Sequence, residues 1–407
     1  MADRSAIVIG AGITGILTAR QLLLAGWDVT VLEAGHVGAG SSSRTAAGIR
    51  QQFSTPGTVR GMRYSVGFYS RFGDETEGGQ CPIVQNGYLF LHDDPVEMAS
   101  GRARVAMQQA VGLTEVEALD AAELAERFAW VVPEGLVGAT WCPSDGFLLP
   151  HIVYGDGAER VRALGGRIVQ RAQVTGAVAA GDRITEVHST AGAFGADLVL
   201  DCTNAWTSRV GAVLGASPLE VDPLKRYLWF AARGSALSPE SLAGMPLTVS
   251  PGGAYCRPEN AESMLLGKKH PTAPQYDFSD EDQDAIEPDF SHRAGIDAAP
   301  FALWMELAEV IPALADFEGI TATTCGYYAT TPDHNPFMGY DQQRANLIRL
   351  VGFSGHGAMF GPFTALVAAA LAEAGHDLDT VDVDGEPVDL GAFAIGRSYD
   401  HSESMVI

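Results

Sequence analysis

The sequence predicts an α/β fold built around a buried parallel sheet, and three observations support this prediction. Residues 6–35 follow the order strand, glycine turn, helix and strand, beginning with an apolar run rich in β-branched residues. Residues 347–374 repeat the order of buried strand, glycine-containing turn and helix. A further buried strand at residues 198–200 follows a long excursion, as if the chain returned to the first sheet. Strands that alternate with helices favour a mostly parallel sheet.

The first glycine turn has the spacing of a dinucleotide-binding motif. Gly10, Gly12 and Gly15 follow the first strand in G-x-G-x-x-G order, and Glu33 ends the second strand. The glycines allow a tight turn, close approach of a pyrophosphate to the backbone, and close packing of the helix on the sheet. The helix N-terminus offers free N–H groups to phosphate oxygens. Glu33 is placed to accept hydrogen bonds from ribose hydroxyls and would repel a 2′-phosphate, which disfavours NADP. This motif by itself is compatible with NAD and with FAD.

Length and charge restrict the classes of protein to consider. The chain has 407 residues, of which 46% are hydrophobic, which predicts two domains rather than one core. The formal net charge of −24 would repel nucleic acid and anionic membranes, so neither is an expected partner. The apolar run 360–374 is expected to be too short to cross a bilayer.

The cysteines indicate a reducing compartment. Five cysteines are scattered along the chain, and none forms a C-x-x-C pair. A disulfide framework or a zinc site is therefore not expected, and the predicted location is the cytoplasm. The sequence also lacks an H-E-x-x-H motif, so no metal site is predicted.

The remaining elements follow from apolar periodicity and turn residues. Helices are expected over residues 58–72, 103–129, 151–166 and 301–314. Strands are expected near residues 84–90, 167–189, 227–231, 254–257, 264–267 and 323–331. The acidic stretch 271–300 has no apolar period and is expected to form a surface loop or a weak helix.

Several segments together resemble one known family. The segments are IVIGAGITG with Glu33, SSSRTAAGIRQQF (41–53), CTNAWT (202–207), YCRPE (255–259), YYATTPDHNPFMG (327–339) and GFSGHGAMFGP (352–362). This combination resembles the FAD-dependent D-amino-acid oxidase superfamily, in its sarcosine oxidase and glycine oxidase branch. The resemblance spans the chain and is specific for the superfamily but not for the substrate.

The resemblance implies a domain plan. A discontinuous, Rossmann-like FAD-binding domain would comprise residues 1–80, 146–215 and 318–400. A substrate domain, residues 81–145 and 216–317, would cover the flavin with a mixed or antiparallel sheet.

The resemblance also implies the residues that hold FAD. They are Gly10, Gly12, Ile13, Thr14, Gly15, Glu33, Ala34, Ser42, Ser43, Arg44, Ala46, Ala47, Gly48, Val174, Asn204, Trp206, Gly326, Gly355, His356, Gly357, Ala358 and Met359. The helix after Gly357 would direct its N-terminus at the flavin pyrimidine ring and stabilise negative charge there. The cysteine that holds flavin covalently in sarcosine oxidases matches Gly326. Cys325 is one residue away and so on the opposite face of a strand, which favours non-covalent FAD.

The family reaction oxidises the C–N bond of an amino acid to an imine, which water hydrolyses. The implied substrate is a small secondary or N-substituted amino acid similar to sarcosine. Arg50 matches the arginine that binds the substrate carboxylate, for which a bidentate guanidinium is well suited; a surface arginine or a phosphate contact is the alternative. Tyr255 would face the substrate or pack in the core. His356 would contact flavin or substrate, or only complete the turn.

Besides Gly326 at the position of the covalent cysteine, two further departures from the family pattern leave the activity open. A lysine that helps to bind the carboxylate in monomeric sarcosine oxidases is Met359 here, and an oxygen-activating lysine is Leu265. Lys268 and Lys269 lie nearby, but a shift of one residue changes the face of a strand. The electron acceptor, O2 or another molecule, therefore stays undecided. A D-amino acid or glycine as substrate, and a flavin-binding assembly subunit without turnover, are the alternatives. The expected oligomeric state is a monomer or a small homo-oligomer.

Overall fold

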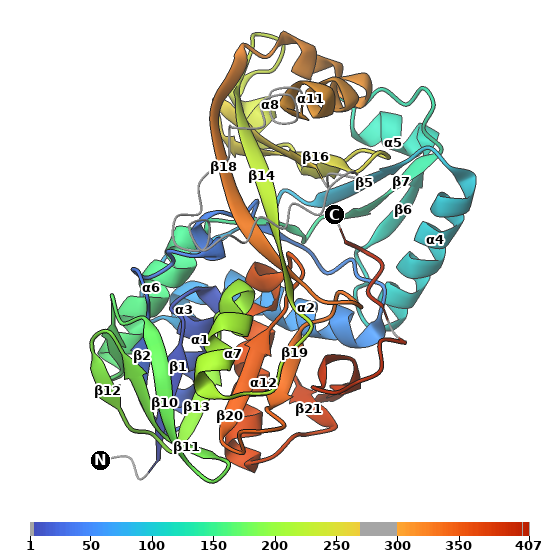
Figure 1. Cartoon of the computed structure of the whole chain (residues 1–407). Helices are drawn as coiled ribbons and strands as arrows, with labels where there is room; N and C mark the ends of the chain where they lie inside the picture. The colour runs from blue at the N-terminus through green and yellow to red at the C-terminus, as the bar shows by residue number, and fades with distance from the viewer. Residues whose placement is uncertain (1–3, 269–298, 401, 407) are drawn as a thin grey trace.

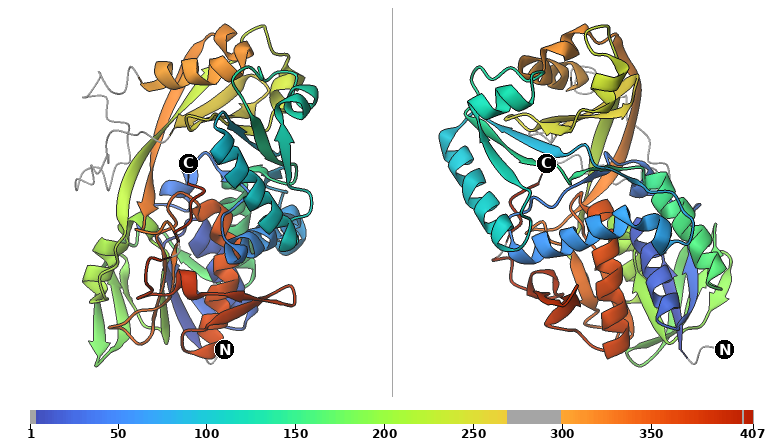
Figure 2. Two further views of the ribbon diagram at one scale, coloured as in Figure 1. Left: turned by 90° about the vertical axis from the view of Figure 1, so that its right-hand side faces the viewer. Right: turned by 180° about the vertical axis from the view of Figure 1, so that it is seen from behind.

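The computed structural model describes residues 4–268, 299–400 and 402–406. The chain forms two bodies, each built on one large sheet (Figure 1). We call them the six-stranded body and the eight-stranded body. Figure 2 shows the same two bodies from the side and from behind, joined by the long strands β14 and β18.

The six-stranded sheet has the strand order β19-β20-β13-β1-β2-β9. It is parallel except for β19, which runs antiparallel to β20. Its strands are β1 (Ser5–Ile9), β2 (Asp28–Leu32), β9 (Arg167–Val169), β13 (Leu198–Asp201), β19 (Phe337–Tyr340) and β20 (Leu347–Val351). The α/β class and the parallel sheet predicted from the sequence are confirmed.

Side-chain alternation along β1 divides the core of this body into two layers. Ala6 and Val8 face helices, whereas Ile7 and Ile9 face a small sheet on the other side. The helical layer contains α1 (Ile13–Leu24), α2 (Pro56–Ser70), α6 (Pro150–Ala163) and α12 (Gly357–Ala374). The opposite layer contains β10 (Val174–Ala180), β11 (Arg183–Ser189), β12 (Gly192–Phe194) and α7 (Thr207–Leu214). The sheet is therefore covered on both faces, as expected for parallel strands.

Helix α12 corrects one expectation. It begins at Gly357 and has 18 residues, so by length and composition it could cross a membrane, unlike the shorter run expected from the sequence. The helix packs against α1 and α2, and 61% of it is buried inside the protein. Its apolar surface is accordingly used in the core of the six-stranded body.

The eight-stranded sheet has the order β18-β14-β17-β16-β15-β5-β7-β6. All its pairs are antiparallel except β15 with β5, so the mixed sheet expected from the resemblance is present. Its strands are β5 (Tyr88–His92), β6 (Glu117–Asp120), β7 (Gly138–Cys142), β14 (Asp222–Ala232), β15 (Leu247–Val249), β16 (Ala254–Asn260), β17 (Ser263–Lys268) and β18 (Gly319–Thr330).

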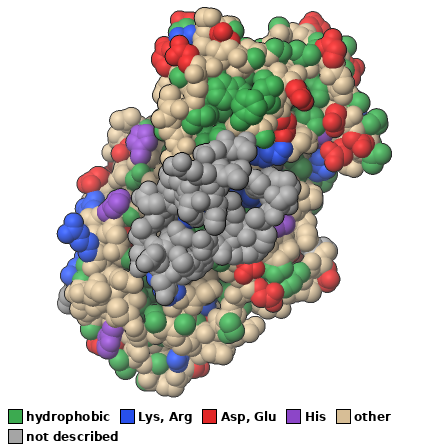
Figure 3. Space-filling view, turned by 45° about the horizontal axis from the view of Figure 1, so that its top comes forward, with side chains coloured by type: hydrophobic (Ala, Val, Ile, Leu, Met, Phe, Trp, Pro, Cys, Tyr) green, Lys and Arg blue, Asp and Glu red, His purple; other side chains and the backbone are tan. Residues whose placement is uncertain are grey.

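The two faces of this sheet have different surroundings. One face packs on α8 (Pro239–Ala243) and α11 (Ala299–Val310), while α4 (Pro95–Ala110) and α5 (Ala121–Arg127) cover the end at β6 and β7. The other face carries a separate apolar cluster that we call the apolar wall: Tyr88, Phe90, Leu228, Leu247, Val249, Tyr255 and Leu265. On the outside of the eight-stranded body, Figure 3 shows hydrophobic side chains gathered among acidic ones.

Short elements complete the fold. A three-stranded sheet is formed by β3 (Gly48–Ile49), β8 (Gly146–Leu148) and β4 (Ile83–Val84), and a hairpin by β21 (Thr380–Val383) and β22 (Glu386–Asp389). Helix α3 spans Phe72–Glu75, and 3-10 turns span Ser41–Ser43, Asn204–Trp206, Pro312–Asp316 and Gly391–Phe393.

Two expectations about this architecture were wrong. The helix expected over 103–129 is two helices separated by β6, because Gly112 at φ +92° ends the first and a capping box at Asp120 starts the second. Strand β18 pairs with β14 in the eight-stranded sheet, although the resemblance implied that residues 318–400 belong to the nucleotide-binding domain. The apolar pattern of a strand does not identify its partner. The other domain boundaries stay a prediction, and most of the stretch 271–300 lies outside the described residues.

Candidate active site

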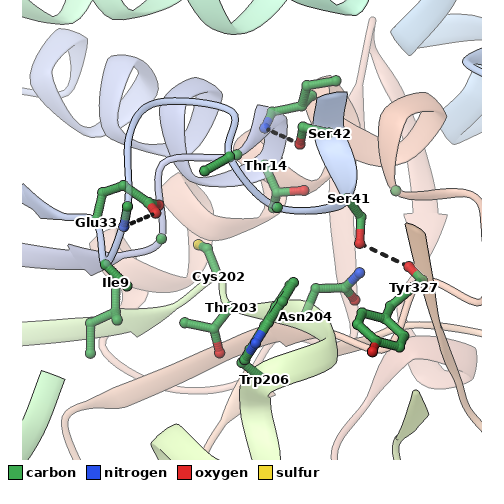
Figure 4. A pocket seen from close by; sticks show the side chains of 18 of the residues that line it. Ile9, Thr14, Glu33, Ser41, Ser42, Cys202, Thr203, Asn204, Trp206 and Tyr327 are labelled. Atoms are coloured by element: carbon green, nitrogen blue, oxygen red, sulfur yellow. Dashed lines mark hydrogen bonds between the residues drawn. The ribbon is translucent and has the colours of Figure 1, made fainter. Parts of the chain in front are cut away.

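A cavity of about 470 Å³ lies where the carboxyl ends of β1, β2 and β13 meet the end of β18. Its volume is in the range typical of small-molecule sites. The lining comes from segments far apart in the sequence, including both glycine turns and the loop that contains Arg44. Figure 4 shows the side chains of this cavity, with Ile9 and Glu33 on the left, Ser41 and Tyr327 on the right, and Trp206 below.

The first glycine turn is tight enough to require glycine at each position of the motif. Gly10 has φ +101°, and a Cβ there would lie 2.9 Å from the carbonyl oxygen of Cys202. A Cβ on Gly12 would lie 2.9 Å from Ser42 Oγ, and one on Gly15 only 1.9 Å from the Gly10 carbonyl oxygen. The turn therefore brings bare backbone to the cavity, as the sequence predicted.

The N-terminus of α1 faces this cavity. Its N-cap is Gly12, which has no side chain to cap the first N–H groups, and Ile13 N–H donates to Ser42 Oγ at 3.0 Å. Glu33 accepts from the N–H of Ala11 at 2.7 Å and of Gly35 at 2.8 Å (Figure 4). A carboxylate has about four lone-pair positions, so Glu33 keeps acceptor capacity for hydroxyl groups. This end of the cavity can hold a pyrophosphate beside a ribose.

The second glycine turn has the same construction. Gly355 has φ +92°, and a Cβ there would lie 2.3 Å from the ring of Tyr328. Asn204 Oδ1 holds the backbone before the turn by accepting from Gly352 N–H at 3.0 Å and Phe353 N–H at 3.3 Å. Helix α12 then begins without a side-chain cap, so its N-terminus is open to a ligand.

The loop 41–47 closes the cavity against β18. Ser41 Oγ donates to the carbonyl of Tyr327 at 2.9 Å (Figure 4). A Cβ on Gly326 would lie 2.6 Å from the carbonyl oxygen of Arg44, so this strand position must be small. Cys325 points the other way and is fully buried in the core of the eight-stranded body. The face expected for Cys325 is therefore the one observed.

A second, smaller cavity of about 20 Å³ adjoins the first and shares Tyr328 and Gly355 with it. The apolar wall forms one side through Tyr88, Leu247 and Tyr255. Tyr255 lies flat against Gly267, where a Cβ would be 2.4 Å from its hydroxyl oxygen. Burial raises the pKa of Tyr255 well above its ordinary value, so this hydroxyl keeps its proton and can donate.

Arg50 lines neither cavity, but it is fully buried next to His356 and Tyr88, which line the smaller one. Its guanidinium stacks over the ring of Phe53 at 4.1 Å. Nη1 donates to the carbonyl of Gln52 and Nη2 to the carbonyl of Met405, whereas Nε has no hydrogen-bond partner. In the part of the chain that the structure describes, Arg50 forms no ion pair within 4.0 Å. A buried cation with an unused donor is typical of a site for an anionic ligand.

His356 links Arg50 to the second glycine turn. Its Nε2 lies 3.3 Å from Arg50 Nη2, and its ring meets Phe53 edge-on at 5.2 Å between centroids. Arginine has no acceptor, so Nε2 must accept and the proton must be on Nδ1. Burial, followed by the charge of Arg50, holds the pKa of His356 well below its ordinary value. His356 is consequently neutral and fixes the position of Arg50.

The glycine turns, the open N-termini and the buried arginine match a known family. The family model described as FAD dependent oxidoreductase matches residues 5–371. The chain belongs to this family. Its cofactor is accordingly FAD, and the backbone cradle described above fits the dinucleotide.

Individual relatives are distant. FAD-dependent oxidoreductase domain-containing protein 1 of Bos taurus is 24% identical over 97% of this chain and 84% of its own. The solved structure of L-proline dehydrogenase from P. horikoshii is 27% identical, covers 92% of this chain and 94% of its own, and has a TM-score of 0.80. Glycine oxidase from Geobacillus kaustophilus, at 20% identity over 97% of this chain and 99% of its own, has a TM-score of 0.78 and supports the fold.

Most of the residues predicted to hold FAD meet at the two cavities. Those lining the larger cavity are Gly10, Gly12, Ile13, Thr14, Glu33, Ala34, Ser42, Arg44, Val174, Asn204, Trp206, Gly326, Gly355, Gly357 and Ala358. Those lining the smaller cavity are Ala46, Ala47, Gly48, His356 and Met359. Gly15 and Ser43 line neither: Gly15 packs on the turn below, and the Ser43 hydroxyl donates to the carbonyl of Gly40.

The structure shows which face of β17 carries Leu265 and which carries the neighbouring Lys268. Leu265 belongs to the apolar wall, on the side of the FAD cavity. Lys268 is on the opposite face of β17, where it pairs with Glu306 of α11. Lys269 is outside the described residues. Neither the matching position nor its described neighbour therefore puts a lysine beside the flavin.

Three residues near this site, Asp145, Arg226 and Tyr328, were not predicted from the sequence. Asp145 is fully buried behind Arg50, where it accepts from Gln51 N–H at 2.8 Å and Gln52 Nε2 at 3.1 Å, and burial raises its pKa to about 6. Arg226 lies on the same face of β14 as the wall residue Leu228, with its guanidinium 5.3 Å from the ring of Tyr328. The Nε of Arg226 is buried and has no partner. The alternation of side chains along β14 and β18 could have indicated that Arg226 and Tyr328 face the site. No pattern in the sequence indicated Asp145.

Proposed function

We propose that this FAD-dependent oxidoreductase oxidises the C–N bond of a small secondary or N-substituted amino acid. The product is an imine, which water hydrolyses. The observation that carries this proposal is Arg50: a fully buried guanidinium whose Nε–H has no acceptor, next to the smaller cavity. A buried cation requires an anion, and a carboxylate pairs with guanidinium through two parallel hydrogen bonds.

The smaller cavity has room for about one water molecule, so a substrate can bind there only if the lining moves apart. Leu247, Tyr255 and Met359 line this cavity and give it mostly apolar walls. Three relatives are named for secondary amines: L-proline dehydrogenase, sarcosine dehydrogenase and 4-methylaminobutanoate oxidase. Others are named glycine oxidase, which keeps glycine or a D-amino acid as the alternative substrate. Sarcosine dehydrogenase of Homo sapiens is much longer, since the chain spans 38% of it.

The residues of the cavity define the protonation state that the substrate needs. When bound, FAD accepts the hydride that leaves the substrate carbon. His356 is neutral but its Nε2 already accepts from Arg50, and Tyr255 keeps its proton. Among the residues lining the smaller cavity, no carboxylate or lysine is available as a base. The substrate therefore binds with its amine unprotonated, and we expect kcat/KM to rise with pH through the pKa of that amine.

Electron transfer to an acceptor other than O2 fits this site. Leu265 replaces the lysine that activates oxygen in sarcosine oxidases, and Lys268 is paired with Glu306 on the far face of the sheet. We therefore propose a dehydrogenase. We also propose that FAD is bound without a covalent link, because Cys325 is buried away from the cavity and Gly326 faces it.

The test compares amines that differ only in the carboxylate. The yellow holoprotein is mixed anaerobically with L-proline or pyrrolidine, and with N-methylglycine or dimethylamine, while oxidised flavin absorbance is recorded. The proposal predicts bleaching by at least one amino acid and by neither plain amine. Equal bleaching by pyrrolidine and L-proline would exclude a carboxylate clamp. Bleaching only by glycine or D-alanine would select the alternative substrates.

A second experiment, with different electron acceptors, distinguishes a dehydrogenase, an oxidase and a flavin-binding subunit without turnover. The reduced protein is exposed to air or to an artificial electron acceptor, and peroxide release is measured. Turnover with the acceptor and little peroxide is the expected result. Bound FAD without turnover on any substrate or acceptor would instead support an assembly subunit.

A further inference from the structure

The segment Ser402–Val406 lies between the two bodies, close to Arg50. In Figure 1 the dark red segment near the end of the chain runs from the six-stranded body towards β5 and β16. Arg50 Nη2 donates to the carbonyl of Met405. The Met405 side chain packs on the apolar wall that also forms the side of the smaller cavity. The segment thus covers the arginine that we propose as the carboxylate clamp.

Specific contacts hold this segment in place. Glu403 is 2% exposed, and its carboxylate accepts from Ser54 N–H at 3.1 Å and from Ser54 Oγ at 2.6 Å. Met405 N–H donates to the same carboxylate at 2.9 Å. Glu403 N–H donates to the carbonyl of Asp333 at 2.9 Å, and Arg397 fixes the Asp333 carboxylate at 2.8 Å. A segment with a buried, fully bonded carboxylate has a defined docking position.

The hydrogen bonds of Arg50 show what the segment does there. A carboxylate that binds side-on accepts from Nε–H and from an Nη2–H on the same edge of the guanidinium. Nε–H has no partner, but Nη2 already donates to the carbonyl of Met405 and meets His356 Nε2 at 3.3 Å. Nη1, on the other edge, donates to Gln52. Both hydrogen atoms of Nη2 therefore have an acceptor, and a side-on carboxylate needs one of these acceptors to move away.

We propose that residues 402–406 form a gate that must leave Arg50 before a carboxylate substrate binds. This proposal rests on the proposed role of Arg50. In the closed state the carbonyl of Met405 serves as a substitute for the substrate carboxylate and the Met405 side chain seals the apolar wall. The substrate carboxylate then competes with the carbonyl of Met405 for Arg50. The apparent affinity for a carboxylate is the affinity of the open state multiplied by the fraction of protein that is open. Opening the gate exposes both donors of the clamp.

The first arm of the test needs no substrate. Holoprotein that ends at Asp400 is compared with the full chain in the rate at which 2,3-butanedione modifies Arg50, followed by peptide mass spectrometry. We expect roughly fivefold or faster modification without the gate, because protection scales with the open fraction. Equal rates for the two proteins would overturn the gate.

The second arm uses acetate as the probe, followed by the perturbation of flavin absorbance. We expect acetate to bind the shortened protein at least about fivefold more tightly, since the competition is removed. Unchanged affinity would also overturn the gate. If removal of the segment accelerates modification of Arg50 but acetate binds neither protein, the gate stands and the proposed carboxylate role of Arg50 fails.

One double variant and one control, both in the full chain, test the gate in case the shortened protein does not fold. Glu403→Gln with Ser54→Ala loosens the segment in the full chain and is expected to shift both readouts in the same direction, with flavin content unchanged. Glu373→Gln is the matched control, because Glu373 pairs with Arg4 on the surface. If the double variant changes the modification rate and the acetate affinity no more than Glu373→Gln does, the proposal is overturned. This comparison still decides the question if the shortened protein loses FAD.

Discussion

The two ends of the active site are built differently. The end that holds the nucleotide uses backbone: bare glycines, helix N-termini and a single acidic side chain, Glu33, that is itself bonded to backbone N–H groups. The end that we propose for the substrate uses buried side chains, with Arg50, Asp145 and His356 supplied by three distant segments. A backbone site is specified by local spacing, whereas a side-chain site is specified by tertiary packing. The first has no space for added atoms, whereas the second contains a buried guanidinium that has no ion pair among the described residues.

The largest expected effect comes from adding one methyl group to the backbone end. Gly15→Ala places a Cβ where the Gly10 carbonyl oxygen would be 1.9 Å away, so the turn must shift. We expect FAD binding to weaken by roughly 1,000-fold, equivalent to about 4 kcal/mol. Flavin content after purification and a fluorescence titration measure it. Gly155→Ala is the control, since nothing lies within 4 Å of that Cβ. If Gly15→Ala binds FAD as tightly as the wild type, the claim that the nucleotide end depends on bare backbone is wrong.

At the substrate end, Arg50→Met should separate substrate binding from cofactor binding. Loss of a buried charge-assisted pair should cost about 2–5 kcal/mol of substrate binding. KM would then rise by roughly 30-fold or more, with flavin content unchanged. Arg60→Met is the matched control, because Arg60 pairs with Glu386 at the surface. Unchanged kinetics of Arg50→Met would remove Arg50 from the site.

The buried carboxylate at the substrate end predicts a pH dependence of stability. Burial raises the pKa of Asp145 from 3.8 to about 6, so the folded protein holds this proton more tightly than the unfolded chain. The contribution of Asp145 is therefore fully favourable below about pH 4 and is lost as the pH rises to about 6. At about 1.4 kcal/mol per pKa unit, wild type should lose on the order of 3 kcal/mol relative to Asp145→Asn between these values. Denaturant unfolding of both proteins from pH 4 to 7 measures this, and parallel curves would contradict it.

The smallest effect is expected on the far face of the eight-stranded sheet. Lys268→Met removes a half-buried ion pair with Glu306, which we expect to cost about 1 kcal/mol of stability. Because Lys268 is directed away from the flavin, the rate at which O2 reoxidises the reduced protein should not change. Stopped-flow reoxidation in air-saturated buffer measures this rate. A clear slowing would put Lys268 beside the flavin and contradict the observed face of β17.

The difference between the two ends also explains what the sequence could predict. The strands, the glycine turns and the opposite faces of Cys325 and Gly326 follow from local spacing and strand alternation. Arg50 and Tyr255 were found through motifs of the resembling family. Asp145, Arg226 and the segment 402–406 were not found, because their roles depend on which distant segments meet. The same limit applies to β18, whose pattern predicted a strand but not the sheet to which it belongs.

The most direct test of the central claim is a crystal structure of the FAD-bound protein with acetate. The account predicts a carboxylate oxygen within about 3 Å of Arg50 Nε and a second at Nη2, with the carbonyl of Met405 displaced. Acetate bound at another site, with Nη2 still bonded to Met405 and nothing at Nε, would contradict the assignment of Arg50 as the carboxylate clamp.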